Sequence, residues 1–207
     1  MPETVSIIIP TRAMRYAYRL PPGADEVILQ GGEGGCAHAK NLGARRARGS
    51  ILLFVDDDQE LWGDLRFLRH PPRQEAAWHV RHHYETTRDA YTAHAFRMLN
   101  VMLWTGSALG VGPCMAIRRR LFETLGGFRY DIIWEDKDLA QRVLELGPPM
   151  GTMPLVEVTH RPLTRWRDVA AIWGRKQTAP PPGYAPFRRW VPTATAAGTW
   201  GTTRAPR

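Results

Sequence analysis

The sequence is poor in cysteine, has no long apolar run and carries no acidic residue near its C-terminal end. Cys36 and Cys114 are the two cysteines among 207 residues, which excludes a disulfide framework and favours a reducing, cytoplasmic compartment. The opening stretch, MPETVSIIIP, lacks the basic and apolar regions of a secretory signal, so we expect none. No apolar run approaches the roughly 18 residues of a membrane helix, so no spanning segment is predicted.

Positive charge is concentrated at the C-terminal end. The net charge of the whole chain is +8, and no acidic residue follows Asp168. Residues 177–207 are rich in Pro, Thr and Gly and show no periodicity, which predicts an extended basic tail after a single domain over 1–176. Since most of the excess charge lies after Asp168, we expect the domain itself to be near neutral. The basic residues after Asp168 are Arg175, Lys176, Arg188, Arg189, Arg204 and Arg207.

Aromatic and basic residues alternate within the tail, in APFRRWVP at 185–192. This combination is typical of an interface with anionic lipid, so we expect a peripheral contact with the inner membrane face. The alternative is that the tail packs on the domain or on a second subunit.

Short apolar runs alternate with helical segments along the domain. Residues 5–9, 26–30 and 51–55 are nearly continuous apolar runs, typical of strands buried on both faces. Residues 36–48, rich in Ala, Lys and Arg, predict a helix between two of them. The alternation predicts an α/β fold with a mostly parallel central sheet flanked by helices. Further strands are expected at 76–85, 115–119 and 155–159, and further helices at 61–70, 88–103, 120–125, 135–146 and 163–173.

Three consecutive aspartates, Asp56 to Asp58, directly follow the third apolar run. If the strand persists, Asp56 and Asp58 project to one side, about 6.6 Å apart along the chain, and Asp57 projects to the other. Ligands of open parallel sheets bind beyond the carboxyl ends of the strands, so this pair suits Mg²⁺ or Mn²⁺ bridging a diphosphate. Lys40 could pair with the aspartates or reach the diphosphate. The alternative is a solvated acidic turn.

The helix expected at 135–146 begins with acidic residues. Asp136 lies three residues before Leu139, on the face of the apolar stripe that Leu139 forms with Val143 and Leu146. An inward carboxylate at a helix start is a candidate general base. The adjacent Glu135 aligns instead with the charged face, together with Asp138, Arg142 and Glu145. The alternative is that these acids only complement the helix dipole.

Other polar groups in the sequence do not predict a site of their own. GGEGG at 31–35 opens a helix, but Glu33 opposes an anion, and we expect Arg45, Arg46 and Arg48 to form a solvated face. The histidines at 79, 82 and 83 predict a polar strand face, because His82 and His83 point opposite ways on a strand.

Two further residues differ from these groups. Cys114 has no accompanying catalytic histidine signature, so we expect it to pack in the core. His160 directly follows the late strand and could complete a site with Asp58 if the two strand ends meet.

Taken in order, these stretches resemble family 2 glycosyltransferases of the GT-A fold, a Rossmann-like fold of nucleotide-diphospho-sugar transferases. VSIIIPT is similar to the family's opening strand, and AKNLGARRARGSILLFVDDD to its A-R-N-x-G and F-x-D-x-D block. GPCMAIRRRLFETLGGF resembles the segment leading to the acceptor site, and WEDKDLAQRV the helix with the E-D motif. The resemblance covers roughly residues 4–160.

The resemblance implies a role for each matching residue. Pro10, Thr11 and Arg12 border the nucleotide, with Asp56 and Asp57 at the ribose and diphosphate. Asp58 ligates Mg²⁺ or Mn²⁺, and in many relatives a histidine after the E-D helix also binds the metal or diphosphate, here His160. Asp136 is the base that deprotonates the acceptor hydroxyl. Trp134 and Glu135 shape the acceptor or sugar pocket.

One departure from the family concerns the nucleobase. The family usually carries an acid at the end of the second strand, where EVILQGG places Gln30. Gln30 can hydrogen-bond a nucleobase without contributing charge. The segment between the first two strands is also short, so we expect a reduced pocket for the nucleobase. We expect the donor to be a UDP-sugar rather than a GDP- or dTDP-sugar.

The sequence therefore predicts a metal-dependent glycosyltransferase, inverting by resemblance, which moves a sugar from a nucleotide-diphosphate sugar to a saccharide, lipid-linked or protein-glycan hydroxyl. A basic nucleic-acid-binding protein is an alternative raised by the net charge, but the positive charge lies in the tail, so no nucleic-acid partner is expected. A nucleotidyltransferase of related fold is a third. Its triphosphate would need a Gly-rich basic loop, and TRAMRYAYR has arginines but no such glycines.

Overall fold

The computed structural model describes residues 1–11, 20–31, 34–84, 114–131, 135–146, 150–160, 193–194 and 200–201. The strands are β1 (Val5–Pro10), β2 (Glu26–Gln30), β3 (Ile51–Phe54), β4 (Gln59–Gly63), β5 (Ala77–Tyr84), β6 (Met115–Arg118), β7 (Met150–His160), β8 (Thr193–Ala194) and β9 (Trp200–Gly201). The helices are α1 (Gly35–Arg46), α3 (Arg119–Thr124), α4 (Glu135–Glu145) and the 3-10 helix η1 (Leu65–Arg69).

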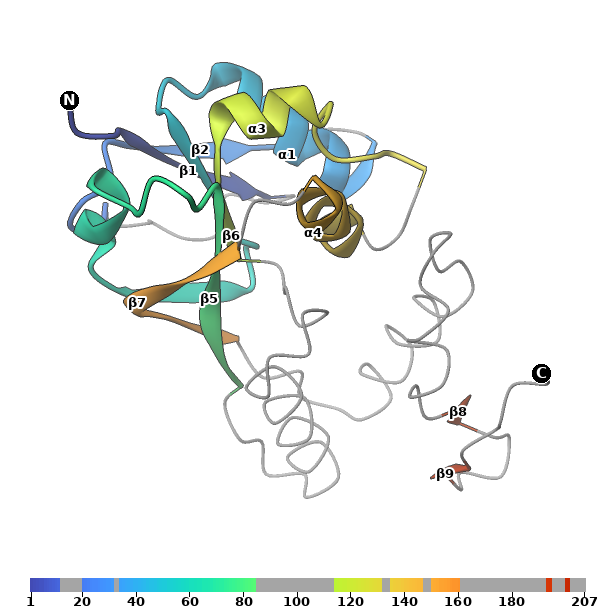
Figure 1. The fold of residues 1–207 in the computed structure, drawn as a ribbon. Helices are drawn as coiled ribbons and strands as arrows, with labels where there is room; N and C mark the ends of the chain where they lie inside the picture. Colours follow the sequence, from blue (N-terminus) through green and yellow to red (C-terminus); the bar gives the residue numbers. More distant parts are fainter. Residues whose placement is uncertain are drawn as a thin grey trace.

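Seven strands form one sheet in the order β2-β1-β3-β6-β5-β7-β4 (Figure 1). The pairs β1–β2, β1–β3 and β5–β7 are parallel, whereas β3–β6, β5–β6 and β4–β7 are antiparallel. Five strands, β1, β2, β3, β5 and β7, therefore run in one direction, and β6 and β4 run against them. The predicted α/β fold with a mostly parallel sheet is confirmed, and β6 and β4 make the sheet mixed.

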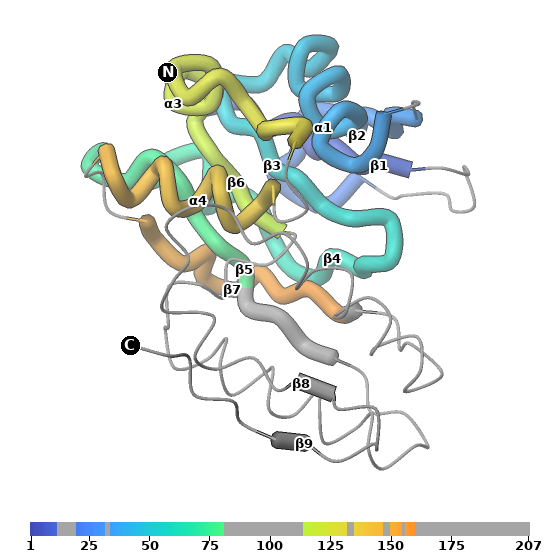
Figure 2. The backbone as a smooth tube through the Cα atoms, turned by 90° about the vertical axis from the view of Figure 1, so that its right-hand side faces the viewer, coloured from blue at the N-terminus to red at the C-terminus, as the bar shows by residue number. Residues whose placement is uncertain are grey.

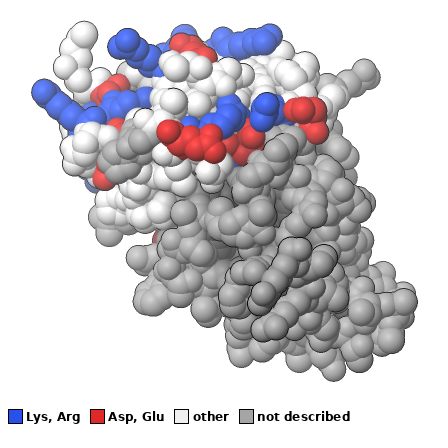
Figure 3. All heavy atoms as spheres, turned by 45° about the vertical axis from the view of Figure 1, so that its right-hand side comes forward, with Lys and Arg blue, Asp and Glu red and all other residues white. Residues whose placement is uncertain are grey.

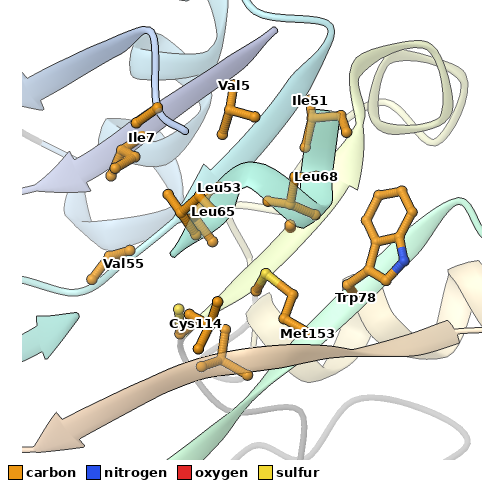
Figure 4. Close-up of a cluster of buried hydrophobic side chains, with 14 of the residues drawn as sticks. Val5, Ile7, Ile51, Leu53, Val55, Leu65, Leu68, Trp78, Cys114 and Met153 are labelled. Atoms are coloured by element: carbon orange, nitrogen blue, oxygen red, sulfur yellow. The ribbon is translucent and has the colours of Figure 1, made fainter. Parts of the chain in front are cut away.

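The two faces of the sheet are covered differently. On one face, Ile8, Leu52 and Phe54 pack against side chains of α1, α3 and α4. On the other face, η1 contributes Leu65 and Leu68, which lie against Val5, Ile51 and Leu53 (Figure 4). Alternate residues of β1 and β3 thus enter opposite layers, because successive side chains of a strand point to opposite faces. Both layers exclude water, which explains why these strands are apolar apart from the hydrogen-bonded Ser6.

Most of the described elements lie where the sequence predicts them, but β4 and the two short tail strands, β8 and β9, were missed. A helix was expected at 61–70, but β4 occupies Gln59–Gly63 and only Leu65–Arg69 is helical, as η1. Gly63, with φ of 110°, separates the two, and the Asp64 carboxylate accepts the Arg66 N–H at the start of η1. The helix prediction was therefore wrong for the first part of this segment, because pairing with β7 holds it as a strand.

Strand β7 is longer than its apolar core of 155–159. Its first residues pair with Ala77–His79 of β5 and its last five with β4, and a register shift separates the two parts of the β5 pairing. Figure 2 shows β4 and β7 side by side. The long strand β7 therefore joins β4 to the sheet, and it fixes the position of Asp57 and Asp58, which directly precede β4.

Several predictions fall on the remainder of the chain. The helices expected at 88–103 and 163–173 lie outside the described residues, as does most of the tail. Within the tail, β8 and β9 form a two-stranded antiparallel pair. None of the described helices is long and apolar enough to cross a membrane.

Candidate active site

The three aspartates follow β3 in a turn rather than in an extended strand. Strand β3 ends at Phe54, and Asp57 and Asp58 form the turn into β4. Gln59 closes it, because its N–H donates to the Asp56 carbonyl at 3.1 Å and its side-chain oxygen accepts the Asp56 N–H at 3.0 Å. The expected strand alternation of these carboxylates was wrong, since the chain reverses here to start β4. The turn keeps them at the carboxyl end of β3.

Lys40 supplies a positive partner for Asp56. Its side chain is only 1% exposed, and its Nζ lies 3.1 Å from Asp56 Oδ1 and 3.0 Å from Glu135 Oε1. The ammonium also lies 5.3 Å from the centre of the Phe128 ring. Burial alone would lower the pKa of Lys40, but the carboxylates of Asp56 and Glu135 outweigh it and hold that pKa well above its ordinary value. Lys40 is therefore charged, buried and bound between two acids.

Negative charge exceeds positive charge around Lys40. Burial raises the pKa of Asp56 to about 6, Lys40 opposes the rise, and repulsion from Asp58, Asp136 and Glu135 adds to it. Three other carboxylates thus repel that of Asp56 beside one ammonium group. A further cation would lower this repulsion.

Helix α4 contributes the acids on the other side of Lys40. Glu135 is the first residue of the helix, and its side chain is only 13% exposed because it faces Lys40. Asp136 follows it and is half-buried. The charge of Asp136 raises the pKa of both Lys40 and Asp56, so Asp136 belongs to the same electrostatic cluster.

The expectation that Glu135 and Asp138 form a charged outer face was wrong. Asp138 is 6% exposed and accepts from Arg142 Nε at 2.8 Å, with Arg129 at 3.4 Å. Asp138 is buried and Glu135 is largely buried, and a basic partner reaches each of them. The apolar stripe is confirmed for Leu139 and Val143, which are fully buried. It fails at Leu146, which lies after the last helical residue and is 56% exposed.

The segment before α4 is fastened to α1 and to α4 itself. Asn41 binds Phe128 twice, donating to its carbonyl at 2.8 Å and accepting its N–H at 2.9 Å. Arg142 donates to the carbonyls of Leu125 and Gly127 at 2.6 and 2.8 Å. Sequence reasoning missed Asn41 and Arg142 as parts of this framework, and it missed Gln59 in the aspartate turn. The roles of Asn41 and Arg142 depend on partners up to 87 residues away, for which the sequence has no local signal.

The residues expected to border the nucleotide meet at the carboxyl ends of β1 and β2. Pro10 pairs with Gln30 across the two strands, and the buried Thr11 donates its N–H to the Gln30 carbonyl at 3.0 Å. The Gln30 side chain has its own partners, since its Oε1 accepts from Arg46 at 2.8 Å and its amide nitrogen donates to the Gly31 carbonyl. A glutamine in that state has fewer groups left to bind a nucleobase than the sequence suggested.

The remaining basic and sulfur-containing residues follow the predictions. Arg45, Arg46 and Arg48 are exposed, and Arg46 and Arg48 additionally reach Gln30 and Glu26 of β2. Cys114 is fully buried in the core, as expected. Figure 3 shows acidic and basic side chains side by side over the described part of one face.

The pairing of β7 with β4 places His160 next to the aspartate turn. His160 is the last residue of β7, and its backbone pairs with Gln59, the residue after Asp58. The end of β7 therefore lies beside the start of β4, directly after Asp58, so the His160 backbone is next to the aspartate turn. The side chain of His160 lies outside the described residues, as do Arg12 and Trp134 entirely.

The aspartate turn offers hard oxygen ligands to a divalent cation. Asp58 is exposed, and Asp56 keeps a second carboxylate oxygen besides the one that Lys40 contacts. Among the described side chains, no group of three His, Cys, Asp or Glu residues is placed to hold a metal ion. Mg²⁺ needs only one or two protein carboxylates when substrate phosphates and water complete its shell. These residues therefore fit a cation that arrives with a diphosphate.

Solved structures of other proteins are similar to this fold. No protein-family model and no curated protein matches the sequence. Among solved structures, the mannosyltransferase PcManGT from Pyrobaculum calidifontis, in complex with GDP-Man and Mn²⁺, is 18% identical with a TM-score of 0.55. That match covers 90% of this chain and 68% of the mannosyltransferase. A mycobacterial protein is 14% identical with a TM-score of 0.50, over 87% of this chain and 77% of its own.

Identities this low support the fold and leave the chemistry to be argued from the residues. The alternation of strands and helices, the mixed sheet and the acids at the carboxyl end of β3 are all present in the described part of the chain. The chain therefore has the GT-A fold.

Proposed function

We propose that this protein is a metal-dependent glycosyltransferase, which transfers a sugar from a nucleotide-diphosphate sugar to a hydroxyl acceptor with inversion. One observation carries the proposal. Lys40 joins the aspartate turn after β3 to the first residue of α4, Glu135, which lies 95 residues after Lys40 along the chain. Acids from two distant segments therefore form one cluster at the carboxyl end of the sheet, where ligands of α/β folds bind.

The donor class is supported by charge and by fold. The excess of carboxylates around Asp56 favours a divalent cation, and such a cation suits a diphosphate. The mannosyltransferase of similar fold is in complex with GDP-Man and Mn²⁺. We therefore assign Asp56, Asp58 and His160 as ligands of Mg²⁺ or Mn²⁺, and Pro10, Thr11, Arg12, Gln30 and Asp57 as neighbours of the nucleotide.

Lys40 takes an indirect part in donor binding. It was expected to reach the diphosphate or the aspartates, and its ammonium is enclosed by Asp56 and Glu135. Its influence on the donor is therefore exerted through Asp56.

The acceptor side is assigned to α4. Asp136 would accept the proton of the acceptor hydroxyl as its oxygen attacks the sugar carbon, on the face opposite the departing nucleotide. The bond from that carbon to the diphosphate oxygen breaks as the new bond forms. When bound, Mg²⁺ or Mn²⁺ supplies Lewis-acid stabilisation of the diphosphate leaving group. Trp134 and Glu135 would border the acceptor, and Glu135 is itself fixed by Lys40.

The test is donor turnover with Mn²⁺ or Mg²⁺ in the full chain and in two variants. Asp136→Asn keeps the shape of the proposed base and removes its basicity, so kcat should fall by about 100-fold or more. Asp58→Ala should raise the metal concentration needed for activity.

A neighbouring acid provides the control for both variants. Glu60 is exposed on β4, two residues after Asp58, and Glu60→Ala should leave turnover unchanged. Wild-type activity in both Asp136→Asn and Asp58→Ala would contradict the assignment.

A further inference from the structure

Lys40 has no opening to solvent, yet it contacts both halves of the proposed site. Its side chain is 1% exposed, and its Nζ lies 3.1 Å from Asp56 and 3.0 Å from Glu135. Burying an ammonium group is unfavourable unless it is paired and hydrogen-bonded. Two carboxylates on opposite sides satisfy that need, and they fix the position of the ammonium between them.

The two carboxylates belong to different parts of the reaction. Asp56 begins the turn that contains Asp57 and Asp58, on the donor side. Glu135 begins α4 and directly precedes Asp136, on the acceptor side. Each of these two segments has one carboxylate bound to the Lys40 ammonium, so Lys40 connects them directly.

The helix that carries Lys40 is a rigid base for this contact. A Cβ added at Gly43 would lie 2.4 Å from Ile8 Cγ2, so α1 packs directly on β1. Ala37 and Ala44 are buried in the same layer. Asn41, which directly follows Lys40 in the sequence, binds Phe128 through two hydrogen bonds. The Phe128 ring in turn lies against the Lys40 ammonium. The position of Lys40 is therefore set by the core rather than by solvent.

We propose that Lys40 is a positioning residue, which fixes the acceptor-side acids Glu135 and Asp136 relative to the donor-side aspartate turn. The inference rests on the proposed function. Transfer requires the base, the acceptor hydroxyl and the sugar carbon in one arrangement, and misplacement by about 1 Å can cost about 100-fold in rate. Lys40 is the link through which α1 sets that arrangement.

A second buried ion pair on α4 provides a matched control. Asp138 and Arg142 are also largely buried and paired at 2.7 Å, and Arg142 holds the carbonyls of Leu125 and Gly127. This pair stabilises the packing of α4 without touching the aspartate turn. Arg142→Met therefore removes a buried cation from the same helix interface and leaves the Lys40 link in place.

The experiment compares Lys40→Met, Lys40→Arg and Arg142→Met by melting temperature and by steady-state kinetics. Lys40→Met should lower kcat by about 100-fold. Lys40→Arg keeps the charge with a different shape and should recover about tenfold of that loss. Arg142→Met should lower the melting temperature and keep kcat within about threefold, because additivity holds for sites that share no partner.

Glu135→Gln keeps the inference testable if Lys40→Met does not fold. This variant weakens only the link to α4 and leaves the pair between Lys40 and Asp56, so kcat should fall while the donor KM stays unchanged. Wild-type kcat in Glu135→Gln, or in folded Lys40→Met, would overturn the positioning role. Absence of wild-type turnover with every nucleotide sugar would instead refute the proposed function, so the two failures are distinguishable.

Discussion

Asp56 and Gln59 exchange two hydrogen bonds across the turn that follows β3. The Gln59 N–H donates to the Asp56 carbonyl at 3.1 Å, and the Gln59 side-chain oxygen accepts the Asp56 N–H at 3.0 Å. Gln59 is only 2% exposed, so water cannot readily replace its amide. The buried side chain thus determines how the carboxylates of Asp56, Asp57 and Asp58 are presented.

Replacing Gln59 should loosen the aspartate turn. Gln59→Leu has a similar volume but cannot accept the Asp56 N–H, and leaving a buried donor unpaired costs about 1–3 kcal/mol of unfolding free energy. The loss is measured by urea denaturation, and the Mn²⁺ needed for half-maximal activity should rise in parallel. Glu60→Leu at the next, exposed position is the control. Equal stability of Gln59→Leu and the wild type would show that the turn does not depend on this amide.

Two adjacent glycines test the contact between the loop before α4 and Asn41. Gly126 and Gly127 both have φ of 75°, so alanine is strained equally at each. A Cβ at Gly127 would lie 2.6 Å from Asn41 Oδ1, whereas a Cβ at Gly126 meets nothing within 4 Å. Gly127→Ala should therefore lower the unfolding free energy by about 1–3 kcal/mol more than Gly126→Ala does. If both variants lost the same unfolding free energy in urea denaturation, the loss would come from backbone strain alone and not from the contact with Asn41.

Stability should decrease in acid through Glu26. Burial would raise the pKa of Glu26, but hydrogen bonds from Ser6 and from the Arg48 N–H, and the charge of Arg48, outweigh it and lower that pKa from 4.5. A lowered pKa in the folded state means that the stabilisation is complete above pH 4.5 and is lost as the pH falls through the folded value.

Glu26→Gln removes this titration. The variant should have a flatter dependence of unfolding free energy on pH below 4.5 than the wild type, measured by urea denaturation in a pH series. Glu60→Gln, at an exposed position, is the control for the replacement of a carboxylate by an amide. Parallel curves for Glu26→Gln and wild type would exclude Glu26 as a source of the acid sensitivity.

Metal and nucleotide should stabilise the protein together. A ligand that binds only the folded state raises its apparent stability. UDP, GDP and dTDP are each tested by thermal shift with Mn²⁺, with Mn²⁺ and excess chelator, and without metal. We expect the largest shift with one diphosphate plus Mn²⁺, and its loss in Asp58→Ala. A shift of the same size after chelation would contradict a cation that bridges protein and diphosphate.

The elements whose environment is uniform could be predicted from the sequence. β1 and β3 are buried on both faces, so every side chain except the hydrogen-bonded Ser6 is apolar, and the apolar run can be recognised without knowing its partners. The presence of acids at the carboxyl end of β3 and at the start of α4 was likewise predictable, because charged residues directly after an apolar run are conspicuous. The strand β4 was missed because its exposed Glu60, Trp62 and Gly63 give no apolar pattern.

The sequence by itself determined the fold class, through local apolar periodicity and chain order, and it located acids directly after β3 and at the start of α4. Only the tertiary structure decided how the acids are neutralised. Lys40 lies 16 residues before Asp56 and 95 before Glu135, and its burial between them results from packing α1 on β1 beside α4. Electrostatic energy depends on distance in space and on exclusion of water, and neither quantity is contained in the spacing along the chain.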